Sequence, residues 1–333
     1  FYSIAGVAGF CARSMSATRG EFSSRFGFLM AASGSAVGLG NIWGFPTNTA
    51  SNGGAAFLFA YLILVFLLAY PALMAELIIG RHAKANAVNA LRGLSRGPVS
   101  YGLATLVGFA GIVTVSLILS FYTIVSGWMM AFLLDPLARL AGLQSAAAWL
   151  TAYGVLRNSI FVVLFMGLTV YVISAGVKQG IEKWASRLMP SLIVIMILLI
   201  VYVITLPGAG EGLRAYLVPN FDAITNPSLI INAMGQAFFS LSLGVGTMLI
   251  YGSYVSRREN LPALGSMVAL LDVGIAVLAG LLILPAMYVA QTNGVAIFDE
   301  AGGLIAGPGL ILSVLPALFN TMGTIGILVA LAF

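Results

Sequence analysis

The sequence predicts an all-α integral membrane protein, built from inverted repeats, whose first and sixth transmembrane helices are broken. Three observations predict this fold class. First, 60% of the 333 residues are hydrophobic and only 8% are charged, whereas about a quarter of the residues in a soluble domain are charged. Second, long charge-free runs recur along the chain, and a spanning helix needs about 20 apolar residues. Third, paired glycines interrupt two of these runs in the same pattern.

Charge-free runs and loop signals divide the chain into eight candidate spans. They are predicted at about residues 24–50, 54–79, within 97–134, 158–177, 186–206, within 223–256, within 261–290, and from 321 onward. The third run is longer than a bilayer requires, so we expect that helix to be tilted or to project into water. The eighth run stops at Phe333 after roughly 13 residues, too few to cross the hydrocarbon core. We therefore expect the chain to be a fragment of a longer protein.

The basic residues predict the orientation of these spans. With the N-terminus in the cytoplasm, the outer segments hold Arg139, Arg157 and Arg214, and the other 12 of the 15 Lys and Arg are cytoplasmic, as the positive-inside rule requires. The net charge of +5 is thus explained by topology, and we expect no nucleic-acid partner. We expect a multi-pass protein of the cell inner (plasma) membrane.

The expected organisation follows from these spans. Residues 1–23 form a cytoplasmic segment, 24–206 hold helices one to five as a first repeat, and 207–225 form an extracellular loop. Residues 226–333 hold helices six and seven, extracellular loop 4 and the start of helix eight, an incomplete second repeat.

Two glycine-containing stretches lie where lipid surrounds the chain. AVGLGN at 36–41 and SLGVGT at 242–247 both place two glycines, one residue apart, before a polar side chain. Interrupted spans at corresponding places in two halves are typical of transporters with inverted repeats. An unwound segment frees amides that suit a carboxylate and carbonyls that suit a cation. An amino acid bound together with Na⁺ matches both requirements, because its carboxylate suits the freed amides and the Na⁺ suits the freed carbonyls.

Two other interpretations of these glycines are weaker. A single stretch would be better explained by close helix packing, for which membrane helices use small residues. Two matched stretches, each flanked by side-chain oxygens such as those of Asn41 and Ser240, favour binding instead. A dinucleotide fingerprint fails because Trp43 stands where the third glycine should be, and no strand precedes it.

Two carboxylates lie within predicted spans, where an unpaired charge is costly. Asp272 is about ten residues from the cytoplasmic end of its helix, so it lies deep in the bilayer, and a bound cation or a proton would neutralise it. Glu76 lies beside Arg81 and either pairs with it or belongs to the permeation path. The only histidine, His82, is in a cytoplasmic loop, and no metal-ligand cluster or nucleophile triad appears. We expect no enzyme and no organic cofactor.

Five motifs in the same order resemble the neurotransmitter:sodium symporters, especially their bacterial amino-acid transporters. They are SAVGLGNIWGFP (35–46) with SNGGAAF (51–57), PALMAELIIGR (71–81), GIEKWASRLMP (180–190) and GQAFFSLSLGVGTMLIYGSYV (235–255). The resemblance covers residues 19–333. Members have eleven or twelve spans, so the resemblance also implies that this chain is incomplete.

The resemblance implies Na⁺ as the bound coupling ion. One sodium site would use the Ala36 carbonyl, the side chains of Asn41 and Ser240, and Asp272, where the family more often has Asn. A second would use the carbonyls of Gly34 and Val37, with its other ligands beyond Phe333.

The resemblance also implies a small amino-acid substrate. The implied substrate residues are Ala36, Gly38, Leu39, Gly40, Ile118, Tyr122, Phe239, Ser240, Ser242 and Val245. The amides of Leu39 and Gly40 and the hydroxyl of Tyr122 would hold the substrate's backbone. Gly38 stands where monoamine-transporting members have Asp, and it leaves room for a carboxylate brought by the substrate.

Gate residues are implied at Arg19, Phe22, Tyr122 and Phe239. Gly44 departs from the family because an arginine of the outer gate normally stands there. Chloride-dependent members line an anion site with Tyr, Gln and two Ser. Tyr61, Gln236 and Ser240 match three of these positions, but the fourth is Ala276. We expect no chloride requirement, with the Asp272 carboxylate replacing the anion.

The function expected from the sequence is sodium-coupled symport of a neutral or apolar α-amino acid into the cell by alternating access. The alternatives are proton-coupled transport through Asp272 and a non-transporting membrane scaffold or sensor. The expected partners are the substrate and the lipid bilayer, with the protein a monomer or homodimer.

Overall fold

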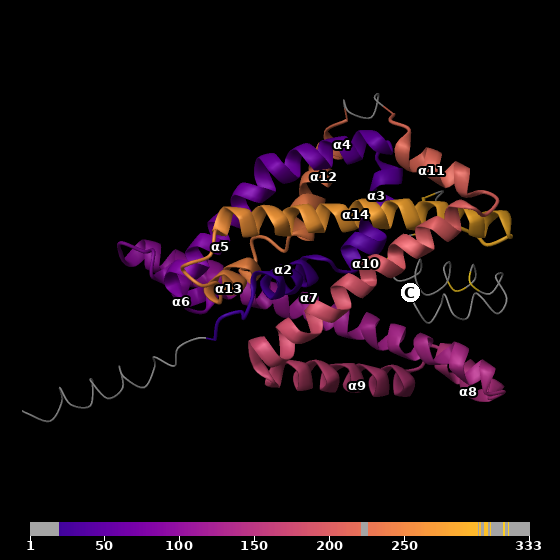
Figure 1. The fold of residues 1–333 in the computed structure, drawn as a ribbon, viewed down its shortest axis with the longest axis horizontal. Helices are drawn as coiled ribbons and strands as arrows, with labels where there is room; N and C mark the ends of the chain where they lie inside the picture. The colour runs from indigo at the N-terminus through magenta and orange to yellow at the C-terminus, as the bar shows by residue number, and fades with distance from the viewer. Residues whose placement is uncertain are drawn as a thin grey trace, which may run out of the picture.

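The computed structural model describes residues 20–220 and 226–298, together with Glu300, Gly303–Ile305, Gly307, Pro316 and Phe319. The predicted eighth span, the gate residue Arg19 and most of the N-terminal segment lie outside these residues. The described part is helical, and its only β-structure is the isolated bridges Gly54–Pro219 and Phe298–Leu304. The predicted all-α membrane fold is confirmed (Figure 1).

The helices follow one another with short connections. Their bounds are α2 Arg25–Ala36, η1 Gly40–Gly44, α3 Phe45–Ser51, α4 Ala55–Leu64, η2 Val65–Ala69, α5 Tyr70–Ala83, α6 Ala87–Arg92, α7 Pro98–Leu140, α8 Gln144–Thr151, α9 Val155–Ser174, η3 Val177–Glu182, α10 Lys183–Ile204, α11 Ala209–Leu217, α12 Pro227–Ser240, α13 Thr247–Ser253 and α14 Leu261–Thr292. The η elements are π-helical turns.

Six of the predicted spans are recognisable by length and composition. Five helical segments are long and apolar enough to cross a membrane: 55–83, 98–140, 155–174, 177–204 and 261–292. The pair α2 and η1–α3 forms a sixth candidate, bent by 60° at its break. These segments confirm predicted spans one to five and seven. Span five starts at Val177 rather than at Ser186, because its first turns carry charged side chains that the charge-free criterion excluded.

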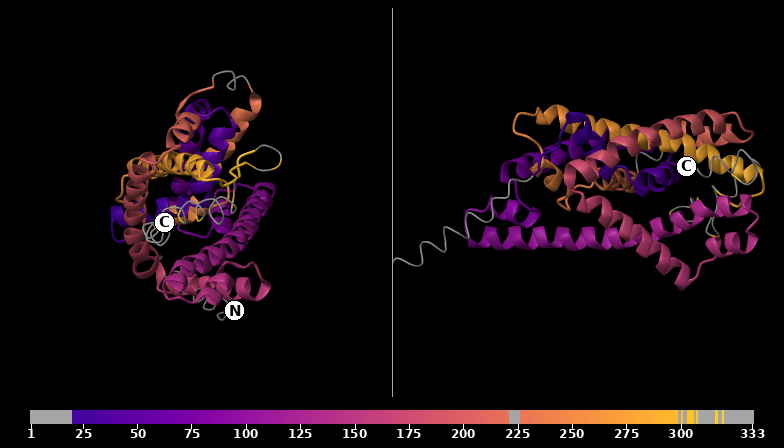
Figure 2. Two further views of the ribbon diagram at one scale, coloured as in Figure 1. Left: turned by 90° about the vertical axis from the view of Figure 1, so that its right-hand side faces the viewer. Right: turned by 60° about the horizontal axis from the view of Figure 1, so that its bottom comes forward.

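The helix α7 is the longest element, with 43 residues. At 1.5 Å per residue it is about 65 Å long, roughly twice the hydrocarbon thickness of a bilayer. Figure 2 shows α7 extending along one side of the molecule past the neighbouring helices. The prediction that this run exceeds what a bilayer requires is therefore confirmed.

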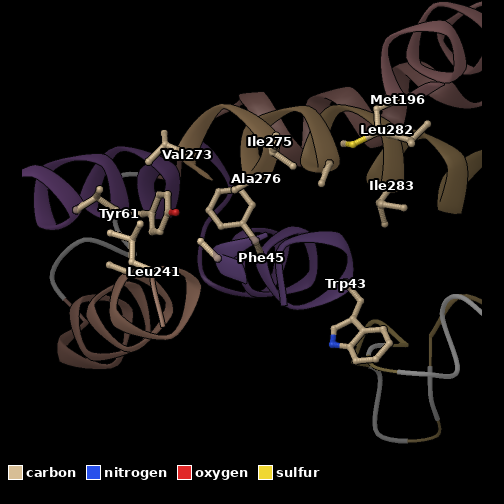
Figure 3. Packing of buried hydrophobic residues seen from close by; sticks show 14 of the residues in the cluster. Trp43, Phe45, Tyr61, Met196, Leu241, Val273, Ile275, Ala276, Leu282 and Ile283 are labelled. Atoms are coloured by element: carbon tan, nitrogen blue, oxygen red, sulfur yellow. The ribbon is translucent and has the colours of Figure 1, made fainter. Parts of the chain in front are cut away.

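The helix α14 lies at the centre of the fold. It packs against α2, η1, α3, α5, α10 and α11, and Figure 1 shows it running between the helices above and below it. Figure 3 shows Phe45 and Tyr61 packed beside Val273, Ile275 and Ala276 of this helix. Most of α14 is buried in the protein, so a polar residue on its packed face, such as Asp272 at 0% exposure, is shielded from lipid.

The break in span six is longer than the one in span one. The residues from Leu241 to Gly246 separate α12 from α13. Ser242, Gly244 and Gly246 have φ of 53°, 83° and 81°, in the left-handed region that glycine adopts without a Cβ penalty. Two glycines therefore allow the chain to turn where a helix would otherwise continue. The predicted interruption is confirmed, and neither half alone is long enough to span a bilayer.

Candidate functional site

Three polar side chains from three different spans meet beside the break in span one. Asn41 Nδ2 donates to Oδ1 of Asp272 at 2.9 Å and to Oγ of Ser240 at 3.0 Å, and Ser240 Oγ donates to Oδ2 of Asp272 at 2.7 Å. Asn41 and Ser240 are 1% exposed and Asp272 is 0% exposed. The sequence named all three as sodium ligands, and the fold brings them together.

The chemistry of this cluster suits a small hard cation. The Asp272 carboxylate lies in none of the ion pairs formed by the described residues, and its two oxygens are held only by neutral donors. Oxygen ligands from carboxylate, hydroxyl and carboxamide groups are those that hard cations prefer. A half-turn of the Asn41 carboxamide would present its oxygen instead of its NH₂ group to the same point. The residues present therefore fit a Na⁺ ion.

The break itself supplies backbone groups next to this cluster. Ala36 ends α2, and Val37 leaves the helix with an extended backbone, φ −72° and ψ 105°. The amide of Gly38 donates to Oδ1 of Asn41 at 3.2 Å. A Cβ at Gly38 would lie 3.4 Å from the Tyr122 hydroxyl. Gly38 thus faces Tyr122. These are the two residues between which the substrate's carboxylate is expected.

An apolar cavity of about 400 Å³ lies beside the break, with Gly40 and Trp43 of η1 in its wall. Its lining is Gly40, Trp43, Leu117, Ile118, Phe121, Tyr122 and Phe239. Four of the residues expected at the substrate site, Gly40, Ile118, Tyr122 and Phe239, are among them. The lining has no charged side chain, so this cavity suits an apolar group.

Three lining residues, Trp43, Leu117 and Phe121, are not among those expected from the sequence. Helical periodicity could have identified Leu117 and Phe121. They are four residues apart, so they share a helix face, and each directly precedes an expected residue, Ile118 or Tyr122. Trp43 comes from the break motif, and its ring meets that of Phe121 edge-on at 6.5 Å. Figure 3 shows Trp43 projecting away from the packed core around Phe45.

The other six of the ten expected substrate residues are not in this lining: Ala36, Gly38, Leu39, Ser240, Ser242 and Val245. Ser242 instead donates through Oγ to the Ser35 carbonyl at 3.4 Å, which ties the two breaks together. Val245 lies in the break of span six, where its carbonyl is close to Gly111 of α7. Gly34 and Val37, predicted for the second sodium site, lie at the end of α2, and Leu39 lies between α2 and η1.

Glu76 has a partner that the sequence did not suggest. Its carboxylate accepts hydrogen bonds from the amides of Gly244 at 2.7 Å and Leu249 at 3.2 Å. Arg81 donates to the Glu259 carbonyl at 2.9 Å and forms none of the ion pairs of the described residues. Of the two expectations for Glu76, pairing with Arg81 is wrong. The carboxylate instead satisfies amides freed where span six is broken.

The end of the molecule where α2 begins is closed by aromatic and ionic contacts. The Phe22 ring stacks on Tyr251 at 6.2 Å and meets Phe28 and Tyr254 edge-on at 5.4 and 6.3 Å. Ion pairs join Arg25 to Glu259 at 2.6 Å and Lys84 to Glu21 at 2.9 Å. These contacts close the fold around Phe22, one of the expected gate residues.

A buried carboxylate fastens α2 to the start of span five. Glu182, 5% exposed, accepts from the Ser23 amide at 2.8 Å, the Ser23 hydroxyl at 2.5 Å and the Ser24 hydroxyl at 3.2 Å. A carboxylate at a helix N-terminus is favourably placed for the helix dipole. The sequence reasoning missed this residue, although it stands in the GIEKWASRLMP motif.

Comparisons with known proteins agree with this geometry. The sequence profile described as "Sodium:neurotransmitter symporter family" matches residues 19–152 and 139–333. The uncharacterized sodium-dependent transporter YhdH of Bacillus subtilis is 37% identical over 94% of this chain, and an uncharacterized sodium-dependent transporter of Haemophilus influenzae is 30% identical over 91%. The sodium- and chloride-dependent taurine transporter of Rattus norvegicus is 28% identical over 91%. The chain spans 68%, 66% and 55% of these relatives' lengths.

A solved structure has the same fold. The crystal structure of MhsT in complex with L-phenylalanine superposes with a TM-score of 0.78 at 37% identity. The match covers 95% of this chain and 69% of MhsT. At this identity the likeness extends to the sequence as well as to the fold.

Proposed function

The chain belongs to the sodium:neurotransmitter symporter family, and from this premise we propose that it transports a neutral or apolar α-amino acid into the cell together with Na⁺. The observation that supports the proposal best is the buried cluster of Asn41, Ser240 and Asp272. This cluster holds a carboxylate with no basic partner among the described residues, so a cation would complete its neutralisation.

The substrate class follows from the space at Gly38 and from the apolar lining of the cavity. A Cβ at Gly38 would come no closer than 3.4 Å to the Tyr122 side chain, so this glycine leaves room for the carboxylate of an amino acid. The apolar cavity beyond Gly40 would take the side chain. MhsT, whose structure contains L-phenylalanine, supports a large apolar side chain as the first candidate.

Each residue has a distinct task in this proposal. Bound Na⁺ would supply a positive charge beside the substrate's carboxylate. Asp272 provides the fixed negative charge of the site, and Ser240 orients its carboxylate through a 2.7 Å hydrogen bond. The Tyr122 hydroxyl and the Gly40 amide hold the substrate, with Phe239 as the ring beside them. The carbonyls of Gly34 and Val37 are assigned to a second sodium site.

Orientation and chloride use are part of the same proposal. The N-terminus would be cytoplasmic and the membrane the cell's inner (plasma) membrane, because the basic residues concentrate on that side. Under this orientation Phe22 and Glu182 belong to the inner gate. Chloride would not be required, since Asp272 already brings a negative charge to the site and Ala276 offers no hydroxyl.

The test is uptake of labelled amino acids by the natural full-length protein reconstituted in vesicles. An inward Na⁺ gradient should drive uptake of an apolar amino acid such as L-phenylalanine, and K⁺ in place of Na⁺ should abolish it. Uptake driven by a pH gradient without Na⁺ would favour proton coupling through Asp272 instead. Na⁺-dependent binding without any uptake would favour the scaffold or sensor.

A further inference from the structure

The second half of span one and the first half of span six are connected by uncharged amide side chains. Asn48 Nδ2 donates to Oε1 of Gln236 at 3.3 Å. One turn further along, Asn232 Nδ2 donates to Oδ1 of Asn52 at 3.0 Å. Asn48 and Asn52 are four residues apart on one chain, and Gln236 and Asn232 are four apart on the other. Each pair therefore shares a helix face, and the two faces run antiparallel.

Both ends of this series are fixed to the backbone of span one. Asn52 Nδ2 donates to the Asn48 carbonyl at 2.8 Å, and Gln236 Nε2 donates to the Gly40 carbonyl at 3.4 Å. Gly40 lines the apolar cavity. Gln236 is only 6% exposed, and a buried amide without partners would be costly. The series thus reaches from the rim of the molecule to the wall of the cavity.

Gly44 lies on the same face, one turn before Asn48. A Cβ there would have only Oε1 of Gln236 within 4 Å, at 3.8 Å. Residue 44 therefore makes no side-chain contact with α12. The amide side chains of Asn48 and Gln236 connect the two half-helices instead. In membranes, Asn and Gln side chains that bond across helices hold them together without bringing a charge into the bilayer.

We propose that Asn48, Asn52, Asn232 and Gln236 form an amide ladder that fastens α3 to α12 during transport and positions the Gly40 carbonyl beside the cavity. The inference rests on the proposed transport function and adds positioning residues to it. The outer halves of spans one and six move as one body, joined by uncharged hydrogen bonds in place of a charged gate residue at position 44.

The first test joins the outermost pair covalently. Cysteines replace Asn52 and Asn232 in a full-length protein whose native cysteines, Cys11 among them, are all changed to serine, and a short bifunctional thiol reagent links the two. The linked transporter is expected to retain Na⁺-driven phenylalanine uptake within twofold of the unlinked protein. Uptake that is lost on linking and restored by reduction would overturn the ladder, because the two halves would then have to separate. Failure to link two cysteines that each react singly would also overturn it.

The second test asks whether Asn48 and Gln236 act through one bond. Asn48→Ala should raise the KM for uptake at least threefold, and Asn48→Gln, which keeps an amide, should restore part of it. The double variant should match Gln236→Ala alone, because that change already breaks the bond to Asn48. Effects that add would contradict the ladder. The control is Asn89→Ala, the loss of an exposed asparagine in α6, which should leave KM unchanged.

These outcomes separate the ladder from the proposed function. If the unmodified protein takes up no amino acid with Na⁺, the proposed function fails before any variant is compared. If it does, and the linked protein or the double variant behaves otherwise than stated, the ladder alone is wrong.

Discussion

Ser240 donates a 2.7 Å hydrogen bond to the carboxylate of Asp272, a residue 32 positions later in the chain, at the point where span six is about to break. The hydroxyl therefore orients a fully buried carboxylate that has no basic partner among the described residues. In the proposed function, Asp272 is therefore the charge on which the cation site would depend.

Asp272→Asn should weaken Na⁺ affinity at least tenfold, about 1.4 kcal/mol. The substitution keeps the shape of the side chain but removes the negative charge that attracts the cation. The measurement is the Na⁺ concentration that half-saturates substrate binding in the full-length protein. An unchanged Na⁺ affinity would remove Asp272 from the site. A change in an exposed carboxylate, Glu211→Gln, is the matched control.

Replacing chloride by gluconate should leave uptake unchanged. The Asp272 carboxylate already supplies a negative charge beside Ser240, and Ala276 on the same helix has no group that could bind an anion. Initial uptake rates in the two media, at equal Na⁺, are the measurement. Uptake that collapses in gluconate would show that an anion is needed after all.

Gly40→Ala and Gly44→Ala should differ sharply although the two glycines are one turn apart. A Cβ at Gly40 would lie within 3.0 Å of the Phe239 ring, whereas one at Gly44 would meet only Gln236 at 3.8 Å. Gly40→Ala should therefore displace Phe239 and lower substrate affinity at least fivefold, and Gly44→Ala should bind substrate almost normally. The measurement is the substrate affinity of both variants by binding titration. Equal affinities would contradict the predicted clash between a Cβ at position 40 and the Phe239 ring.

Glu76→Ala should destabilise the protein. The substitution leaves the amides of Gly244 and Leu249 without the acceptor they have now. Leu249 is buried, and an unsatisfied buried amide costs about 1–3 kcal/mol. Thermal unfolding in detergent should show a lower midpoint, and uptake should fall with it. Glu76→Gln, which keeps one acceptor oxygen, should lie in between, and Glu211→Ala should have no effect. A stable, active Glu76→Ala protein would mean that these bonds are dispensable.

Phe22→Ala should loosen the contacts at the start of α2. Phe22 touches the rings of Phe28, Tyr251 and Tyr254, and aromatic pairs each contribute about 0.5–1.5 kcal/mol beyond their buried area. The neighbouring Phe26 is 52% exposed, so Phe26→Ala is the matched control. The thermal midpoint should drop clearly for Phe22→Ala and little for Phe26→Ala. Similar midpoints would show that the ring cluster does not hold this end closed.

Much of the fold follows from local sequence signals. Charge-free runs predicted eight spans, since a bilayer demands an uninterrupted apolar stretch for each helix, and six of them are recognisable among the described residues. Paired glycines predicted both breaks, because glycine lowers the cost of leaving the helix. The resemblance carried by the five motifs implied one sodium site for Asn41, Ser240 and Asp272, and these three side chains are in contact. The start of span five was misplaced because charged residues continue the helix beyond the apolar run.

The sequence by itself thus determined the membrane class, the two interruptions and the polar residues beside them. Only the tertiary structure decided that Glu76 bonds to the Gly244 amide, that Glu182 fastens the start of α2, and that Asn52 meets Asn232. The physical reason is that these partners stand 168, 159 and 180 positions apart. Periodicity reports which face of a helix a residue occupies, but which other face it meets depends on how all the helices pack.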